Sequence, residues 1–436
     1  MTKGGFGLGL ARVSMVALTV PMWLSAQSLE IKVDRESAVY KNGELATLTV
    51  LAKDSEGKAL KAGLLKIALN NFGPNVITNA VFDLAQANPV IISGALREPG
   101  FMRCDAAIKI GDKDVKKMFG VAYSPEKIEP GCARPADFDE FWNAAMKKTE
   151  AEVPLDPKVE RIEKASNDQF DSFRVSFATV GGKRVYGFLC VPAGAGPFPV
   201  MVNVPGAGPG TVSPSKGVAK KGFISLVMNV HPFEPAEKID EQKRLYSEQD
   251  RVLKERYGAP RYCQSGATER ETYFFYPIIL GINRAVNWVA ERPDVDKSRF
   301  LYSGASQGGG FGFYLCGLNR NFTKGVIHVP ALTDLLGFQK DRASGWPKLI
   351  ESLPESDKAA AVKVAPYFDG AHFAPRITCP VRVSVGFIDT TCPPPAVYAG
   401  YNALKVQDKE ILHGLYMPHA VFPDIRQRLD VQWLKK

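Results

Sequence analysis

The feature that most constrains the fold is a G-x-S-x-G sequence, Gly304-Ala305-Ser306-Gln307-Gly308. It stands between an apolar segment of strand character, 299–302, and an apolar segment of helical character, 311–318. A serine on so sharp a strand-to-helix turn needs small neighbours, because the strand and the helix approach closely. It also lies at a helix N-terminus, where the helix dipole favours developing negative charge. The sequence therefore predicts a nucleophile elbow with Ser306 as the nucleophile, in preference to a glycine-rich turn that holds an incidental serine.

Strands and helices alternate on both sides of this turn. The predicted strands are 173–177, 185–191, 198–204, 223–228, 299–302, 326–329, 381–387 and 409–412, and the predicted helices include 276–292 and 424–434. Such alternation implies a mostly parallel sheet covered by helices on both faces. Together with the elbow it predicts an α/β-hydrolase fold for residues 128–436. Asp137, three residues before Glu140, is expected to cap the first helix of this domain.

The residues before this domain follow a different pattern. Short segments that alternate between apolar and polar residues, with turns between them, fill residues 28–126. Several short strands at close spacing predict an immunoglobulin-like β-sandwich. We therefore divide the chain into a signal peptide at 1–26, a β-sandwich domain at 27–127 and a catalytic domain at 128–436.

The first 26 residues have the order of features of a secretory signal peptide. Lys3 and Arg12 give a positive start, an apolar run follows at 13–24, and Ser25-Ala26 supplies small residues for cleavage. The apolar run is short for a membrane span, so cleavage is favoured over a retained membrane anchor. We expect a secreted or periplasmic protein with no stable membrane span.

Charge and cysteine content argue against two kinds of site. The formal net charge is +9, but no long Lys/Arg run carries it, which indicates a mildly basic surface and no nucleic-acid binding. The seven cysteines form no C-x-x-C pair and no cluster with histidine, so no zinc site is indicated. Export permits disulfides, but free buried thiols are expected for most of these cysteines.

A serine hydroxyl becomes a nucleophile only with a general base, and this fold supplies first an acid and then a histidine after the serine. Among the five histidines, His419 follows the last predicted strand in a loop, which favours it over His413 at the strand end. Asp389 directly follows the predicted strand 381–387. We predict that His419 is the general base and that Asp389 orients its ring, in preference to a role for Asp389 in a turn.

Two backbone N–H groups are needed to stabilise the oxyanion that forms during acyl transfer. One is expected from Gln307, directly after the nucleophile. The other is expected from Ala207, in the glycine-rich loop that follows the predicted strand 198–204.

Several stretches resemble the acetyl xylan esterase/cephalosporin-C deacetylase family, which is carbohydrate esterase family seven. They are residues 134–142, 295–299, 304–310 and the D-x-x-C-P-P stretch at 389–394. The resemblance implies a serine hydrolase that removes acetyl groups from xylan or xylo-oligosaccharides through an acyl-enzyme, with no metal and no cofactor. It places the triad at Ser306, Asp389 and His419, and one oxyanion donor at Gln307.

The sequence departs from this family around the expected site. Pro205-Gly206-Ala207 stands where the family has His-Gly-Tyr, which keeps a backbone donor and removes a tyrosine ring. Residues 229–232 replace an Asp-x-Arg-Gly sequence, and Ala420 follows the triad histidine in place of glutamate. The family's short acyl groups imply a shallow acyl pocket, whose expected walls are His231, Phe233 and Pro394.

Other functions fit parts of the sequence. An esterase for feruloyl or glucuronoyl esters would use the same triad. A peptidase of the prolyl-oligopeptidase group would need a propeller, which a segment of about 100 residues cannot build. The intact Ser/Asp/His set argues against a silent glycan-binding protein. We expect an acetylated oligo- or polysaccharide as the partner, and no feature of the sequence specifies an oligomeric state.

Overall fold

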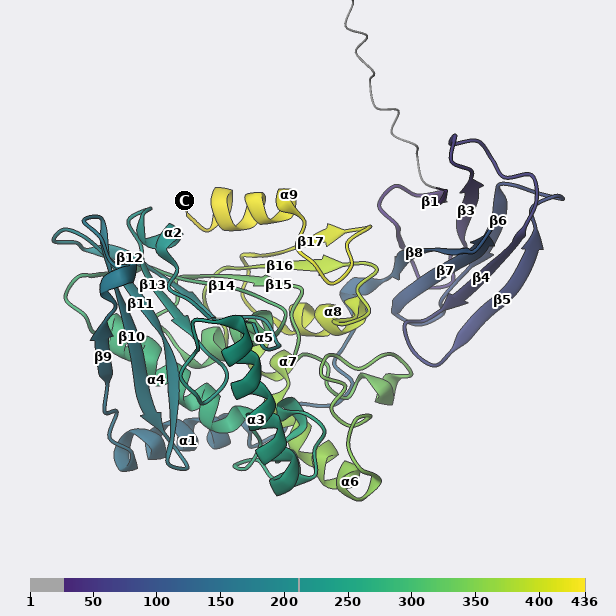
Figure 1. The fold of residues 1–436 in the computed structure, drawn as a ribbon. Helices are drawn as coiled ribbons and strands as arrows, with labels where there is room; N and C mark the ends of the chain where they lie inside the picture. Colours follow the sequence, from purple (N-terminus) through teal and green to yellow (C-terminus); the bar gives the residue numbers. More distant parts are fainter. Residues whose placement is uncertain (1–26, 211, 436) are drawn as a thin grey trace, which may run out of the picture.

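The structure, a computed structural model, describes residues 27–210 and 212–435. Figure 1 shows two parts: a group of β-strands that ends at Tyr123, and a larger part in which helices surround a long sheet. The predicted signal peptide lies outside the described residues. Among the helices that are described, none is long and apolar enough to cross a membrane.

The N-terminal part contains two sheets. The smaller is antiparallel in the order β1-β3-β6, with β1 (Ser28–Val33), β3 (Ala46–Lys53) and β6 (Val90–Gly94). The larger has the order β2-β8-β7-β4-β5, with β2 (Val39–Tyr40), β4 (Leu64–Asn70), β5 (Val76–Asp83), β7 (Gly100–Ile110) and β8 (Lys113–Tyr123). Side chains along β3 alternate between buried and half-buried, as expected for a strand with one face on a core. The immunoglobulin-like sandwich and its boundaries at 27–127 stay predictions.

The larger part is built on a nine-stranded sheet in the order β17-β16-β15-β14-β12-β13-β11-β10-β9. Neighbours from β13 to β17 are parallel, whereas β9, β10 and β11 form an antiparallel end. The strands are β9 (Lys158–Arg161), β10 (Phe170–Thr179), β11 (Lys183–Pro192), β12 (Phe198–Asn203), β13 (Ile224–Met228), β14 (Val295–Ala305), β15 (Lys324–His328), β16 (Val381–Gly386) and β17 (Lys409–Gly414). Every residue of β13 is buried, and four of its five residues are apolar, the exception being the buried Ser225.

Helices cover both faces of this sheet. Figure 1 shows α2 and α9 on one side, and α4, α5 and α8 on the other. The helices are α1 (Phe138–Glu152), α2 (Lys216–Ala219), α3 (Ile239–Tyr257), α4 (Phe275–Ala290), α5 (Gln307–Leu318), α6 (Glu355–Val364), α7 (Gly370–Phe373), α8 (Pro394–Ala403) and α9 (Pro423–Arg426). The C-terminal helix predicted at 424–434 begins as α9 and continues as a π-helical turn at Gln427–Trp433.

One local prediction is wrong. Asp137 precedes α1, but its side chain makes no capping hydrogen bond. The carboxylate instead accepts hydrogen bonds from the Tyr367 hydroxyl and the Arg270 guanidinium. These partners lie far along the chain, so the local capping pattern could not reveal them.

The cysteines agree with the prediction of free thiols. All seven lie within the described residues, none of them forms a disulfide, and only Cys132 is not fully buried.

Candidate active site

The G-x-S-x-G sequence forms the sharp turn between β14 and α5. Ser306 has φ 58° and ψ −121°, a backbone conformation that is strained for a residue with a side chain. A Cβ atom on Gly304 would lie 2.5 Å from the carbonyl oxygen of Gly308. A Cβ on Gly308 would lie 2.0 Å from the carbonyl oxygen of Val204, the residue directly after β12. Both flanking glycines are therefore required by close backbone packing.

Ser306, His419 and Asp389 form a continuous chain of hydrogen bonds. His419 Nε2 lies 2.9 Å from Ser306 Oγ, and His419 Nδ1 lies 2.8 Å from Asp389 Oδ2. Because a carboxylate only accepts, Nδ1–H donates to Asp389 and Nε2 is left to accept from the serine hydroxyl. Asp389 is fully buried, and its Oδ1 accepts the backbone N–H groups of Thr391 and Cys392 at 2.8 and 2.9 Å.

The remaining histidines are held by other partners. His328 contacts Ser384 and Asp430, and His372 contacts two backbone carbonyl groups. His413 Nε2 lies 2.5 Å from the Tyr398 hydroxyl oxygen, and burial lowers the pKa of His413. Of the five, His419 is the one whose ring contacts Ser306 Oγ within the part of the chain that the structure describes.

The two predicted oxyanion donors border one cavity. Gln307 is the first residue of α5, so its backbone N–H has no acceptor within the helix. Gly206 approaches Ser306 closely enough that a Cβ on it would lie 3.9 Å from Ser306 Cβ. The next residue, Ala207, lines a cavity of about 220 Å³ together with Gln307. The arrangement places two backbone segments beside the serine, as an oxyanion hole requires.

Comparison with known proteins places the chain in a family. Residues 123–436 match the sequence model of the acetyl xylan esterase (AXE1) family. The chain belongs to this acetyl xylan esterase family. The acetyl esterase Axe7A of Xylanibacter ruminicola (strain ATCC 19189 / DSM 19721 / CIP 105475 / JCM 8958 / 23) is 31% identical over 332 residues, which cover 76% of this chain and 73% of the relative. The protein is therefore an esterase.

Two solved structures of acetyl xylan esterases share the fold of this family member. The enzyme from Paenibacillus sp. R4 has a TM-score of 0.60 at 22% identity, over 71% of this chain and 98% of the other. Acetyl xylan esterase 1 from Thermoanaerobacterium sp. JW/SL YS485 has a TM-score of 0.57 at 20% identity, over 71% and 96%. These similarities confirm the predicted α/β-hydrolase fold of the catalytic part.

Of the three predicted pocket residues of this esterase, His231 lines the cavity of about 220 Å³. Its ring stacks on Phe233, at 5.4 Å between ring centres, and its Nδ1 accepts from Gln249 Nε2 at 3.0 Å. Burial lowers the pKa of His231 to about 4, so the ring is neutral at pH 7. Phe233 and Pro394 are absent from the described lining of this cavity. Phe233 packs against the His231 ring, and Pro394 is buried in the first turn of α8.

The sequence analysis did not identify two residues that lie near Ser306 and Gln307, namely Cys392 and Tyr262. The buried Cys392 thiol hydrogen-bonds Ser306, and burial raises its pKa well above the ordinary value. Asp389, Cys392 and His419 together offer ligand atoms within 4.8 Å of one another, but a protonated thiol is a poor metal ligand. The Tyr262 hydroxyl donates to Gln307 Oε1 and so anchors that side chain. The D-x-x-C spacing was a signal for Cys392, whereas no sequence pattern pointed to Tyr262.

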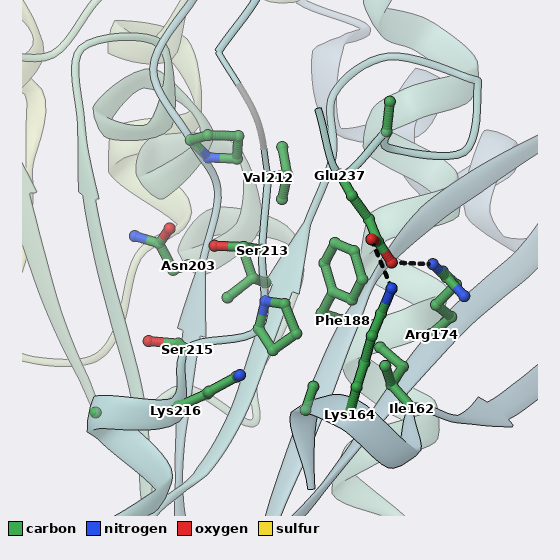
Figure 2. A pocket seen from close by; sticks show the side chains of 16 residues that line it. Ile162, Lys164, Arg174, Phe188, Asn203, Val212, Ser213, Ser215, Lys216 and Glu237 are labelled. Atoms are coloured by element: carbon green, nitrogen blue, oxygen red, sulfur yellow. Dashed lines mark hydrogen bonds and ion pairs between the residues drawn. The ribbon is translucent and has the colours of Figure 1, made fainter. Parts of the chain in front are cut away.

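A larger groove, of about 820 Å³, adjoins the cavity of about 220 Å³. Pro205 and Val212 line both spaces. Figure 2 shows Lys164 and Arg174 converging on Glu237, next to Phe188, with Ser213 and Lys216 on the opposite wall. Glu237 lies 2.7 Å from Lys164 Nζ and 3.0 Å from an Arg174 nitrogen. The groove thus combines a partly apolar floor with charged and hydroxyl groups.

Proposed function

We propose that this esterase removes acetyl groups from acetylated xylan or xylo-oligosaccharides by a Ser-His-Asp acyl-enzyme mechanism. Ser306 is the nucleophile, His419 the general base, and Asp389 the residue that orients the base. The observation that carries this assignment is the unbroken hydrogen-bond chain from Ser306 Oγ through His419 to the buried carboxylate of Asp389. Membership of the acetyl xylan esterase family supports the choice of substrate.

In the first half-reaction, Ser306 Oγ attacks the acetyl carbonyl carbon while His419 Nε2 takes the hydroxyl proton. Asp389 stabilises the imidazolium that forms. The negative charge on the carbonyl oxygen is held by the N–H groups of Gln307 and Ala207. The tetrahedral intermediate then collapses. The C–O bond to the sugar breaks, the sugar oxygen takes the proton from His419, and the acetyl group stays on Ser306.

In the second half-reaction, water takes the place of the sugar. His419 Nε2 accepts a proton from that water as its oxygen attacks the acetyl carbonyl carbon, and the same two N–H groups stabilise the second oxyanion. Collapse releases acetate and returns the proton to Ser306 Oγ. The donors lie on the rigid end of α5 and on the loop after β12, so they need no reorganisation between the two steps.

The two cavities divide the substrate between them. The space of about 220 Å³ beside Gln307 suits the small acetyl group and its developing oxyanion. The adjoining groove takes the sugar chain, whose hydroxyl groups can bond to Ser213, Ser215 and Lys216. Sugars pair apolar ring faces with many hydroxyl groups, and sites that combine apolar lining with a few polar groups suit such ligands.

Export belongs to the same proposal. The positive, apolar and small-residue segments of 1–26 support secretion or a periplasmic location. An immunoglobulin-like sandwich at 27–127 would then precede the catalytic domain in the mature protein. N-terminal sequencing of the exported protein tests cleavage after Ala26, and a sequence that still starts near Met1 would contradict it.

The decisive experiment measures acetate released from acetylated xylan and from acetylated xylo-oligosaccharides by the wild-type protein and by Ser306→Ala. Aryl acetate, a feruloyl ester, a glucuronoyl ester and a peptide anilide serve as comparison substrates. We expect acetate release by the wild-type protein and none above background by Ser306→Ala. A wild-type protein that cleaves feruloyl or glucuronoyl esters faster than acetylated sugar would overturn the substrate assignment. Full activity of Ser306→Ala would overturn the mechanism.

A further inference from the structure

The N-terminal sheets touch the loop that carries the triad acid. We call residues 387–393 the acid loop, because they follow β16 and contain Asp389. Gly120, on β8, packs directly against the first residue of this loop: a Cβ on Gly120 would lie 2.0 Å from the carbonyl oxygen of Phe387. No side chain fits in that space, so here the backbone of the N-terminal part rests on the backbone of the acid loop.

A second contact encloses the side chain of Phe387. Phe101, on β7, packs edge-to-face against it with 5.0 Å between ring centres and 89° between ring planes. The Phe101 ring also lies 5.6 Å from the ring of Tyr398, on α8 directly after the acid loop. Phe101 and Phe387 are both completely buried. The side chain two residues before Asp389 is thus fixed by a ring from the N-terminal part.

The same strand contacts the loop that carries the base. We call residues 415–422 the base loop, because they follow β17 and contain His419. Phe119, next to Gly120 on β8, packs edge-on against Tyr416 with 5.3 Å between ring centres. Phe119 is 1% exposed, whereas Tyr416 is 49% exposed. The buried Phe119 ring therefore supports the half-exposed Tyr416 ring.

The two loops are also joined to each other. The Ile388 N–H donates to the carbonyl oxygen of Met417 at 3.4 Å, and a Cβ on Gly386 would lie 2.3 Å from that same oxygen. A displacement of either loop is therefore passed to the other. β8 contacts both loops through two successive residues, Phe119 and Gly120.

We propose that β7 and β8 of the N-terminal part position the acid and the base of the triad, with Phe101, Phe119 and Gly120 as the positioning residues. This inference rests on the triad assigned under Proposed function. The physical reason is the narrow tolerance of catalytic hydrogen bonds, which weaken steeply when groups move by a fraction of an ångström or rotate out of line. The N-terminal part is then a working component of the active site.

The test uses two substitutions in the full-length protein. In Gly120→Ala the new methyl group must push Phe387 outward, and in Phe119→Ala the contact with Tyr416 is lost. We expect each variant to lower kcat for an aryl acetate at least tenfold while changing KM less than threefold, because neither residue lines the described cavities. Gly100→Ala, on β7 of the same sheet, is the matched control. A Cβ there meets only Leu96 Cδ1, at 3.4 Å, so activity should stay at the wild-type level.

Labelling with a fluorophosphonate separates positioning from loss of folded protein. The final extent of labelling at Ser306 counts folded sites, and the rate of labelling reports activation of the serine by His419. We expect a slower rate with an unchanged final extent in Phe119→Ala. Phe119→Tyr keeps the ring and should recover most of the rate. If Gly120→Ala does not fold, Phe119→Ala and Phe119→Tyr carry the test.

The outcomes distinguish this inference from the proposed function. Wild-type rates in both Gly120→Ala and Phe119→Ala, with Ser306→Ala inactive, would overturn the positioning role and leave the triad intact. A reduced final extent of labelling at a wild-type rate would also overturn it, because the contacts would then serve stability alone. Activity that persists in Ser306→Ala would overturn the triad itself.

Discussion

His419 Nε2 lies 2.9 Å from Ser306 Oγ, within the range of a normal hydrogen bond. In the proposed mechanism, the proton that leaves Ser306 therefore has its acceptor already in place. This contact supports the first two predictions, which concern the triad.

Ser306→Ala is expected to remove nearly all turnover without loss of the fold, because the hydroxyl contributes to chemistry and little to packing. Triad members act as a unit, so the double variant Ser306→Ala/His419→Ala should be little worse than either single variant. Steady-state rates on an aryl acetate measure this, with circular dichroism as the control for folding. Fluorophosphonate labelling that survives in Ser306→Ala would show that another residue is the nucleophile.

Asp389→Asn is expected to lower kcat by about 10³–10⁴, because an amide can donate to His419 Nδ1 and hold the ring in the wrong tautomer. The backbone N–H groups of Thr391 and Cys392 can still bond to the remaining oxygen, so the loop should persist. Asp430→Asn is the matched control, since Asp430 also contacts a histidine, His328, but outside the triad. A loss of less than tenfold for Asp389→Asn would point to a different acid.

Acyl-chain preference tests the small cavity beside Gln307. We expect kcat/KM to fall at least tenfold from acetyl to butyryl esters, because a longer chain must displace packed walls at a cost of about 1–3 kcal/mol. The measurement is kcat/KM across acetyl, propionyl, butyryl and feruloyl esters of one alcohol. A maximum at butyryl or feruloyl would refute the acetyl preference and leave the serine mechanism untouched.

The groove drawn in Figure 2 should bind sugar and not the acyl group. Ser213→Trp would fill it, so we expect KM for acetylated xylo-oligosaccharides to rise at least fivefold while kinetics on an aryl acetate stay unchanged. Lys220→Trp is the control, because Lys220 is exposed nearby and is not part of the groove lining. Equal effects of Ser213→Trp on both substrates would place the defect at the triad instead.

His231 predicts a pH dependence of stability. Its pKa is lowered from 6.5 to about 4 by burial, so the folded protein binds this proton less readily than the unfolded chain. The free energy of unfolding should therefore fall as the pH drops from about 6.5 to about 4, by on the order of 3 kcal/mol from this group. Burial raises the pKa of Asp334 to about 6, which acts in the opposite direction over part of this range.

The difference between wild-type and His231→Gln unfolding curves isolates the histidine, because Asp334 is present in both proteins. Urea denaturation at pH 7, 6 and 5 should show the largest difference in favour of the wild-type protein at pH 7. A difference that does not change with pH would contradict the buried neutral state of His231.

The sequence was most informative at the strand-to-helix turn, because few residue types can adopt so sharp a backbone turn. The turn places Gly304, Ser306 and Gly308 within five residues. The backbone atoms that leave no room for a side chain at the two glycines belong to the turn itself and to Val204, directly after β12. Asp389 and His419 could be chosen because chain order fixes which strand ends meet at one edge of a parallel sheet. The strands that were predicted from runs of apolar residues are present in the structure, with their ends shifted by a few residues.

Contacts between segments that are distant in the sequence could not be predicted from it. Tyr262 contacts Gln307 across 45 positions, and Phe101 on β7 packs against Phe387 in the acid loop. The expected wall residue Phe233 packs on the His231 ring, because the turn after β13 directs the two aromatic rings against each other. Alternation of apolar residues fixes which face of a strand is buried, but not which partner it meets there.

The close approach of Gly120 to Phe387 also limits which N-terminal sequences can be joined to this catalytic part. A contact made by main-chain atoms offers no side chain that could be altered to accommodate a new neighbour. A chimera that joins this catalytic part to a different N-terminal part would need a residue without a side chain at the position that faces the Phe387 carbonyl group. We therefore expect chimeras cut near residue 127 to be soluble but slow unless the donor strand also carries a glycine at the matching position. The Gly120 contact therefore predicts that the two parts must be exchanged together if activity is to be kept.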